Sequence, residues 1–212
     1  MKHLVPLVAV MLICFSGARA HAQYIFSDAN GDSLCNFQDI VVGDPPVDVY
    51  LDTAHDASGA PVACASGEEL SLRWYEIIFR GQGDRHGGYV DFGAWTNAVE
   101  GFTVNLGESR GGSDFRVGFA SSNPVAFLPP GLYKLGTLTV TMTGCTRLEF
   151  ATSSPLSGTF VTGFYSQCPG ADGDYLVKLG TDFYDNCVVG PGICSSTEET
   201  TTTWGKIKMT YR

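Results

Sequence analysis

The longest apolar stretch in the body of this 212-residue chain is Leu70-Ser-Leu-Arg-Trp-Tyr-Glu-Ile-Ile-Phe79. A short continuous apolar run of this kind predicts a buried, central strand of a sheet. Ahead of it, Val47, Val49 and Leu51 alternate with polar residues, which is the pattern of a half-buried strand. Both patterns favour a β fold.

Further runs of strand-like composition follow, separated by glycine, proline and aspartate turns. They cover residues 101–106, 114–119, 132–142, 147–151, 158–164 and 175–179. No window shows helical periodicity, and the 26 glycines of the chain would weaken any helix. The sequence therefore predicts an all-β fold, a β-sandwich or jelly roll of about eight or nine strands.

Residues 1–22 have the features of a secretory signal peptide. Lys2 and His3 form a short positive start, residues 4–15 are apolar, and small residues precede the expected first mature residue, Gln23. The apolar run is shorter than the ~20 residues that a spanning helix needs, and no later segment approaches that length. We expect a secreted protein with no membrane-spanning segment.

The charge balance narrows the choice of partners. Without Lys2 and Arg19 of the leader, 11 basic residues face 22 acidic ones, which gives a formal net charge of −11. Nucleic acids and anionic membranes are therefore poor partners, because both carry negative charge themselves. The remaining 190 residues are enough for a single domain with a substantial core.

Six cysteines remain beyond the leader, and an even number in an exported chain predicts disulfides. About 15 connectivities are possible. Short intervening loops favour two pairings and elimination leaves a third: Cys187–Cys194, Cys145–Cys168 and Cys35–Cys64. The cysteines form no CxxC pair and have no nearby histidine, which argues against a zinc site.

A twelve-residue segment near the start of the mature chain has the spacing of a calcium loop: Asp28-Ala-Asn-Gly-Asp-Ser-Leu-Cys-Asn-Phe-Gln-Asp39. Oxygen-bearing side chains occupy loop positions one, three, five, nine and twelve, and position seven needs only a backbone carbonyl. The candidate calcium ligands are Asp28, Asn30, Asp32, Leu34 through its carbonyl, Asn36 and Asp39.

Two features depart from the standard loop. Ser33 occupies the sixth position, where glycine normally supplies a positive φ, and Asp39 replaces the usual bidentate glutamate. Helices on either side are also missing. The alternative is an ordinary turn rich in aspartate and asparagine. Two other acidic groups, Asp52 with His55 and Asp56, and Asp172 with Asp174, are either a second ion site or strand-connecting turns.

The sequence shows little catalytic machinery. Only His55 and His86 remain beyond the leader, and no Gly-x-Ser-x-Gly elbow is present. Glu76, beside Trp74 and Tyr75, is the one candidate acid for a glycosidase, which needs a second positioned carboxylate. We therefore expect no enzymatic activity.

Five aromatic residues could form a sugar-stacking surface or could equally be core residues. They are Trp74, Tyr75, Tyr89, Phe92 and Trp95. Flat aromatic faces suit pyranose rings, but aromatic residues in β domains mainly form cores and cross-strand pairs. The sequence alone does not decide between these roles.

The C-terminal residues differ in composition from the rest. Residues 195–203 are a polar Ser/Thr/Glu linker. In residues 204–212, Ile207, Met209 and Tyr211 alternate with basic and polar residues, as in an amphipathic strand. This tail is either a sorting signal, a strand offered to a partner sheet, or a frayed terminus.

Two resemblances follow from these residues. The loop resembles one calcium repeat of a dockerin, which runs Asp-x-Asn-Gly-Asp-Gly and continues to Asn at nine and Asp at twelve. The five side-chain ligands match this repeat, whereas Ser33 does not, and a full dockerin has two such loops with helices. The loop is equally similar to a thrombospondin type-three calcium loop.

The body, roughly residues 46–179, resembles the cohesin-like β-sandwich of bacterial surface and cellulosome proteins. The resemblance rests on Leu72-Arg-Trp-Tyr-Glu-Ile-Ile-Phe79 and on the late strand Gly131-Leu-Tyr-Lys-Leu-Gly-Thr-Leu-Thr-Val140. Cohesins are usually poor in cysteine, unlike this chain. The resemblance implies a sandwich fold and a binding role.

The expected organisation is a signal peptide (1–22), a calcium-loop segment (23–45), a cohesin-like β-sandwich (46–194), a linker (195–203) and a basic aromatic tail (204–212). We expect a non-catalytic adhesion module that is stabilised by calcium and contacts a protein or polysaccharide at the cell surface. The alternatives are a small secreted glycoside hydrolase and a structural subunit of an envelope or fibre layer.

Overall fold

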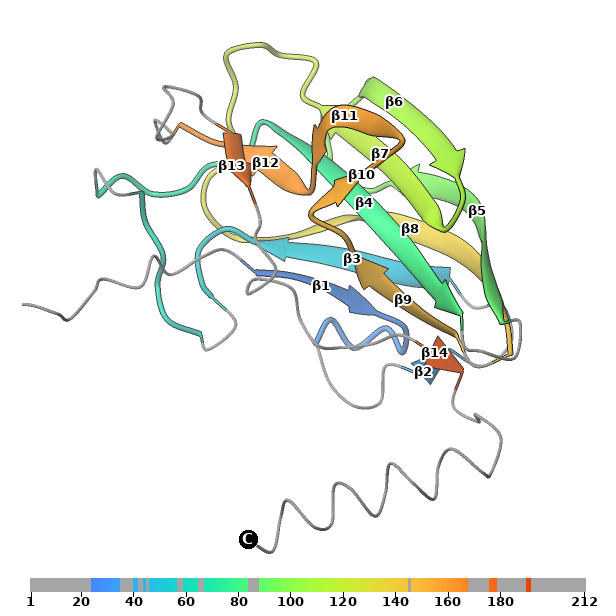
Figure 1. The fold of residues 1–212 in the computed structure, drawn as a ribbon. Helices are drawn as coiled ribbons and strands as arrows, with labels where there is room; N and C mark the ends of the chain where they lie inside the picture. Colours follow the sequence, from blue (N-terminus) through green and yellow to red (C-terminus); the bar gives the residue numbers. More distant parts are fainter. Residues whose placement is uncertain are drawn as a thin grey trace, which may run out of the picture.

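The computed structural model describes residues 24–34, 40–41, 44, 46–56, 59–64, 67–83, 88–144, 146–167, 176–178 and 190–191. Every regular element in these ranges is a strand (Figure 1). None of the described residues forms a helix that is long and apolar enough to cross a membrane. The expected signal peptide, linker, tail, Asp172–Asp174 pair and His86 lie outside the described residues.

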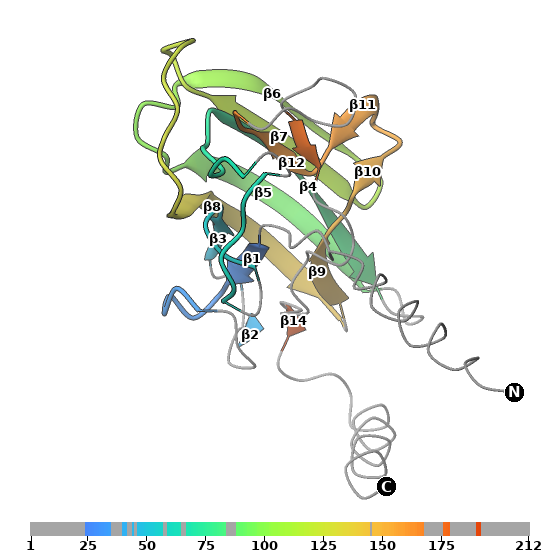
Figure 2. The same ribbon diagram turned by 90° about the vertical axis from the view of Figure 1, so that its left-hand side faces the viewer.

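Two antiparallel sheets make up the fold (Figures 1 and 2). The first has the strand order β1-β3-β8-β5, formed by Tyr24–Asp28, Pro46–Asp52, Leu132–Thr143 and Tyr89–Asn97. The second has the order β13-β12-β4-β7-β6, formed by Leu176–Lys178, Gly163–Tyr165, Trp74–Gly83, Asp114–Ala120 and Val104–Gly111. The all-β class is confirmed, and the two sheets are consistent with a β-sandwich; the jelly-roll connections stay a prediction.

Three further strand pairings complete the described part. Strand β9 (Thr146–Phe150) pairs with the C-terminal half of β4, residues 79–83. Strands β10 (Ser153–Ser154) and β11 (Ser157–Val161) form a small hairpin, and β2 (Ile40–Val41) runs parallel to β14 (Gly190–Pro191). Strand β1 belongs to the first sheet through β3, so the segment expected only to hold calcium also supplies a strand.

The stretch that predicted a central strand does form one, shifted toward its C-terminal side. Strand β4 begins at Trp74 and ends at Gly83, and it pairs with β7 along one edge. Leu72, just before it, forms an isolated bridge with Leu128. Side chains at alternate positions of β4 enter the core, including Tyr75, Ile77 and Phe79, each at most 1% exposed.

The core between the sheets is rich in aromatic residues. Phe79 contacts Trp95, Phe115 and Phe150, with ring centroids 5.5–6.1 Å apart. Val47, Val49 and Leu51 of β3 project into the same core, as their alternation predicted. Each such fully buried side chain stabilises the fold by about 1.5–3 kcal/mol relative to an exposed one.

A bulge in β5 turns two side chains that are three positions apart, those of Phe92 and Trp95, into the core. The register of β5 shifts between Phe92 and Trp95, so both side chains point inward although they are three residues apart. Arg110 of β6 donates hydrogen bonds to the carbonyls of Phe92 and Gly93 at 2.5 and 2.7 Å. This arginine therefore ties the second sheet to the bulge of the first.

The second edge of β4 is shared by two strands. Strand β12 pairs with residues 74–76 and β9 with residues 79–83, and the chain leaves the sheet between them. At the gap, the Ile78 N–H donates to Thr162 Oγ1 at 3.0 Å, and the Ala151 N–H donates to the Ile78 carbonyl at 2.8 Å. The excursion, residues 151–162, carries the β10–β11 hairpin.

The hairpin is anchored to the outer face of the second sheet by a buried ionic group. Arg80 donates to both carboxylate oxygens of Asp114, with N···O distances of 2.8 Å, and also to the Ser153 carbonyl at 3.1 Å. Ser154 Oγ donates to Asp114 at 2.6 Å. Asp114 is only 3% exposed, so its charge is compensated almost entirely by protein groups.

Of the expected cysteine pairs, the structure describes one residue. Cys64 is bonded in a disulfide. Cys35, Cys145, Cys168, Cys187 and Cys194 lie outside the described residues, so the expected connectivity stays a prediction.

Candidate functional site

The predicted calcium loop begins with a tight coil wound around one carboxylate. Asp28, the last residue of β1, is 1% exposed. Its Oδ1 accepts hydrogen bonds from the backbone N–H groups of Asn30 (3.1 Å) and Gly31 (2.7 Å), and its Oδ2 accepts one from Ser33 (2.7 Å). Three amide donors satisfy this buried acid and fix the path of residues 28–33.

Asn30 and Asp32 continue the coil by the same kind of bond. Asn30 Oδ1 accepts from the Asp32 N–H at 3.0 Å, and Asp32 Oδ1 accepts from the Leu34 N–H at 2.8 Å. The Asn30 side-chain amide also donates to Asp32 Oδ2 at 3.1 Å. The three predicted side-chain ligands among the described residues are thus joined in one hydrogen-bonded turn.

Ser33 adopts the conformation that glycine normally supplies at the sixth loop position. Its φ is +60°, in the left-handed region, which costs a non-glycine residue about 1–2 kcal/mol. Its hydroxyl forms a 2.8 Å hydrogen bond with the Tyr50 hydroxyl on β3. The substitution therefore does not prevent the sharp turn, and the serine fastens the coil to the first sheet.

The donor chemistry of the coil fits calcium. Calcium prefers carboxylate and amide oxygens, and Asp28, Asn30 and Asp32 supply them at alternate positions of one turn. The described residues contain no group of three or more His, Cys, Asp or Glu side chains placed to hold a metal. Asn36 and Asp39, the remaining expected side-chain ligands, lie outside the described residues.

The second acidic group near Asp52 forms a turn. Asp52 Oδ1 accepts from the N–H groups of Ala54 and His55 at 2.8 and 3.0 Å, and its Oδ2 lies 3.1 Å from His55 Nδ1. Asp56 Oδ1 accepts from the Ala60 N–H at 3.0 Å. These contacts correspond to the strand-connecting turn, the second of the two roles expected for this group.

Three of the five candidate platform aromatics belong to the core. Tyr75, Phe92 and Trp95 are at most 9% exposed. The Tyr75 hydroxyl lies 2.7 Å from Asn97 Oδ1 and 3.0 Å from the Leu135 carbonyl, and burial raises the pKa of Tyr75. These three rings cannot present a face to a sugar. Tyr89 is 57% exposed at the start of β5.

Trp74 instead belongs to a half-buried group on the outer face of the second sheet. Trp74 of β4 and Tyr165 of β12 are cross-strand partners with stacked rings 5.5 Å apart. Phe127 stacks on Tyr165 at 6.1 Å, and the Arg73 guanidinium lies 5.6 Å from the centroids of both Phe127 and Tyr165. We call Arg73, Trp74, Phe127 and Tyr165 the aromatic–arginine cluster.

The segment that carries Phe127 is held in place by backbone bonds. Leu72 and Leu128 exchange two N–H···O bonds of 2.9 and 2.7 Å. The Arg73 N–H donates to the Tyr165 carbonyl at 3.0 Å, which continues the β4–β12 ladder by one residue. The cluster is therefore positioned by two strands and one pinned loop rather than by a mobile surface segment.

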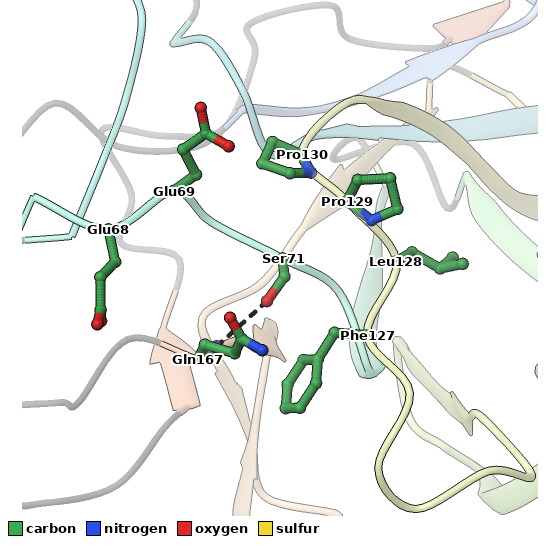
Figure 3. Close-up of a pocket in the computed structure, with 8 residues that line it drawn as sticks. All are labelled: Glu68, Glu69, Ser71, Phe127, Leu128, Pro129, Pro130 and Gln167. Atoms are coloured by element: carbon green, nitrogen blue, oxygen red, sulfur yellow. Dashed lines mark hydrogen bonds between the residues drawn. The ribbon is translucent and has the colours of Figure 1, made fainter.

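An open pocket of about 430 Å³ adjoins the cluster and shares Phe127 with it (Figure 3). Its other lining residues are Glu68, Glu69, Ser71, Leu128, Pro129, Pro130 and Gln167. The Gln167 N–H donates to Ser71 Oγ at 3.4 Å, and the Ser71 N–H donates to Ser166 Oγ at 3.0 Å. One side of the pocket carries carboxylates and an amide, and the other carries proline and phenylalanine rings.

Glu76, the candidate acid, lies two residues beyond Trp74 on the same outer face. Burial raises the pKa of its carboxyl, and the Arg116 guanidinium and the Val161 N–H partly oppose this rise. Its cross-strand partners on both sides are glycines, Gly118 and Gly163. The charged neighbour that influences Glu76 is thus an arginine rather than a second acid.

Comparison with known proteins adds no relative. No protein-family model matches this chain, and neither a curated protein nor a solved structure shows significant similarity to it.

Proposed function

We propose that this chain is a secreted, non-catalytic binding module, stabilised by calcium, that contacts a protein or polysaccharide at the cell surface. The aromatic–arginine cluster carries the proposal. Three aromatic rings and a guanidinium remain half-buried on the outside of the sandwich. Rigid aromatic side chains and arginine are the residues that dominate recognition surfaces.

Calcium has a structural role in this proposal. The coil at residues 28–34 follows directly on β1 and is fastened to β3 through Ser33 and Tyr50. An ion on its oxygens would neutralise the two carboxylates and hold the segment against the first sheet. Because backbone N–H groups already satisfy the Asp28 carboxylate, calcium in this proposal adds stability to a turn that also has its own hydrogen bonds. The resemblance to dockerin and cohesin modules is compatible with this division of roles.

Two measurements test the proposal. The chain without residues 1–22, with its disulfides intact, should bind the producing cell's surface fraction, and free calcium should raise its melting temperature. The Asp32→Ala variant should lose the calcium-dependent rise. The matched control is Asp91→Ala, an exposed aspartate on β5, which should keep it. Failure to retain any surface component would reject the binding role, and an unchanged melting temperature at millimolar calcium would reject the ion site.

A secreted hydrolase is the second candidate, and the raised pKa of Glu76 is the observation that favours it. A general acid must be protonated near the working pH, and burial acts in that direction. The mechanism would still need a second carboxylate within reach, and Arg116 is the charged group that acts on Glu76. Turnover of a polysaccharide that Glu76→Gln abolishes would place this candidate first.

A further inference from the structure

We propose that the aromatic–arginine cluster and the pocket beside it form a binding site for a neutral polysaccharide chain. This inference rests on the proposed binding function and specifies its ligand and its location. The cluster and the pocket meet at Phe127, whose ring stacks on Tyr165 and also lines the pocket. A ligand lying along this surface would meet Trp74 and Tyr165 at one end and Gln167 and Glu69 at the other.

The apolar part of the surface suits sugar rings. Trp74, Tyr165 and Phe127 are each half-buried, so a ligand can remove further aromatic area from water. The backbone bonds around Leu72 and Leu128 fix the Phe127 loop before any ligand arrives. Little conformational entropy would be lost on binding, which is a condition for useful affinity at a shallow site.

Arg73 supplies hydrogen-bond donors that no described residue uses. Its guanidinium lies 5.6 Å from the centroids of both the Phe127 and Tyr165 rings, which orient it, and no described residue accepts a hydrogen bond from it. A guanidinium has five N–H donors in one plane. Two neighbouring hydroxyls of a sugar ring can accept from such a plane together, as a carboxylate would.

The pocket adds planar acceptors and an amide. Glu68, Glu69 and Gln167 are exposed, and the buried Ser71 also lines the pocket (Figure 3). Carboxylates accept hydrogen bonds from hydroxyl groups, and the Gln167 amide can both donate and accept. This lining pairs polar groups with ring surfaces, which is what a molecule with hydroxyl edges and C–H faces requires.

Charge selects a neutral polymer over an acidic one. Two carboxylates that line the pocket and a formal net charge of −11 for the chain without its leader, 11 basic against 22 acidic residues, repel uronic acids and sulfated sugars. A protein partner fits less well, because a stable interface needs roughly 800 Å² on each side with an apolar centre. The pocket here is open, half polar and of ligand size, about 430 Å³.

The test uses the chain without residues 1–22, with its disulfides intact, on a fixed panel of probes. Neutral probes are cellulose, arabinoxylan, amylose and laminarin, and anionic probes are alginate and polygalacturonate. Depletion isotherms and affinity electrophoresis should show binding to at least one neutral polymer and weaker binding to the anionic ones. Trp74→Ala and Arg73→Ala should each reduce affinity about tenfold or more.

Matched variants separate the site from general damage. Trp74→Phe should keep most of the affinity, and Tyr89→Ala should leave it unchanged, because Tyr89 is exposed but outside the cluster. Melting curves must show that each variant is folded. Neutral-polymer binding that survives Trp74→Ala and Arg73→Ala would overturn the location, and preference for the anionic probes would overturn the chemistry.

The remaining outcomes distinguish this inference from the broader function. Retention of a surface protein, lost in Trp74→Ala, together with no binding to any neutral probe, would overturn the polysaccharide inference and keep the binding function. Absence of binding both to the panel and to the cell surface fraction would overturn both.

Discussion

Neutralising Asp114 should destabilise this fold strongly. Its carboxylate accepts two hydrogen bonds from Arg80, one from Ser154 and a longer one from Ser113 at 3.3 Å. In Asp114→Asn the size is unchanged, but the charge disappears and one oxygen becomes an NH₂ group. That group would face an N–H of Arg80 or the Ser154 hydroxyl, both of which donate to Asp114 in the native protein.

The magnitude follows from the burial of the pair. Removing one partner of a buried ion pair costs about 3–5 kcal/mol, because the other charge is left uncompensated. The Arg80 side chain is 33% exposed and can recover some hydration, so we expect the lower end, about 3 kcal/mol. For a protein of this size the melting temperature should fall by roughly 6–12 °C. The exposed pair Arg110–Glu108 provides the control, since Glu108→Gln should cost less than about 1 kcal/mol.

The pH dependence gives a second, independent signature. Hydrogen bonds from Arg80 and Ser154 hold the pKa of Asp114 below its ordinary value of 3.8. The stability that the carboxylate contributes is therefore fully present above pH 3.8 and is lost as the pH falls through the lowered folded-state pKa. Urea unfolding under non-reducing conditions should give a wild-type minus variant difference that shrinks on acidification toward about pH 2. A difference below about 1 kcal/mol at neutral pH, or one that stays constant with pH, would refute the reasoning.

Three further predictions concern single positions. Ser33→Gly should leave the free energy of unfolding nearly unchanged, because relief of about 1–2 kcal/mol of backbone strain offsets the lost hydroxyl bond and the greater unfolded-state entropy of glycine. Ser33→Ala keeps the strain and loses the bond, so it should cost about 1 kcal/mol in urea unfolding. An alanine variant as stable as the glycine variant would contradict this. Gly136→Ala should destabilise the protein by about 1–3 kcal/mol and shift Trp95 fluorescence, because the new Cβ would lie 2.3 Å from the Trp95 ring. Gly131→Ala is the control and should be tolerated, because its new Cβ would lie 3.8 Å from the nearest atom. Equal effects of the two substitutions would exclude the clash. Burial raises the pKa of Glu76, so the stability that its protonated carboxyl contributes to the folded state is lost as the pH rises above 4.5. The stability of Glu76→Gln relative to wild type should therefore increase between about pH 4 and pH 7. A stability difference that does not change with pH would contradict the raised pKa.

Strand periodicity predicted the regular strands well and the irregular ones poorly. The alternation in β3 and the apolar run of β4 both correspond to observed strands, although β4 starts four residues later than the run does. Strand β5 escaped prediction because its bulge places Phe92 and Trp95 on the same face, which breaks the period of two. The run at 158–164 likewise divides into β11 and β12, because the chain turns from the hairpin back to β4 at Thr162.

Of the two candidate sites, the calcium loop could be predicted from the sequence and the aromatic–arginine cluster could not. Asp28, Asn30 and Asp32 were identifiable because the loop is local in sequence, and the backbone N–H groups that donate to these three side chains lie no more than five residues away. The aromatic–arginine cluster was not, since only the register of β4 against β12 brings Trp74 beside Tyr165. Sequence patterns carry no information about which distant aromatic residue will become a cross-strand neighbour.

Because the chain leaves the edge of β4 between β9 and β12, the segment that connects these two strands can change in length during evolution. Strand β12 pairs with residues 74–76 of β4, and β9 pairs with residues 79–83. Residues inserted near Pro155, between β9 and β12, would therefore change neither pairing. New loops could therefore appear over this face while the alignment of every strand beneath is preserved. A pair of residues inserted after Pro155 should leave amide exchange at Ile77 as slow as before, and faster exchange there would show that the excursion helps to hold the sheet together.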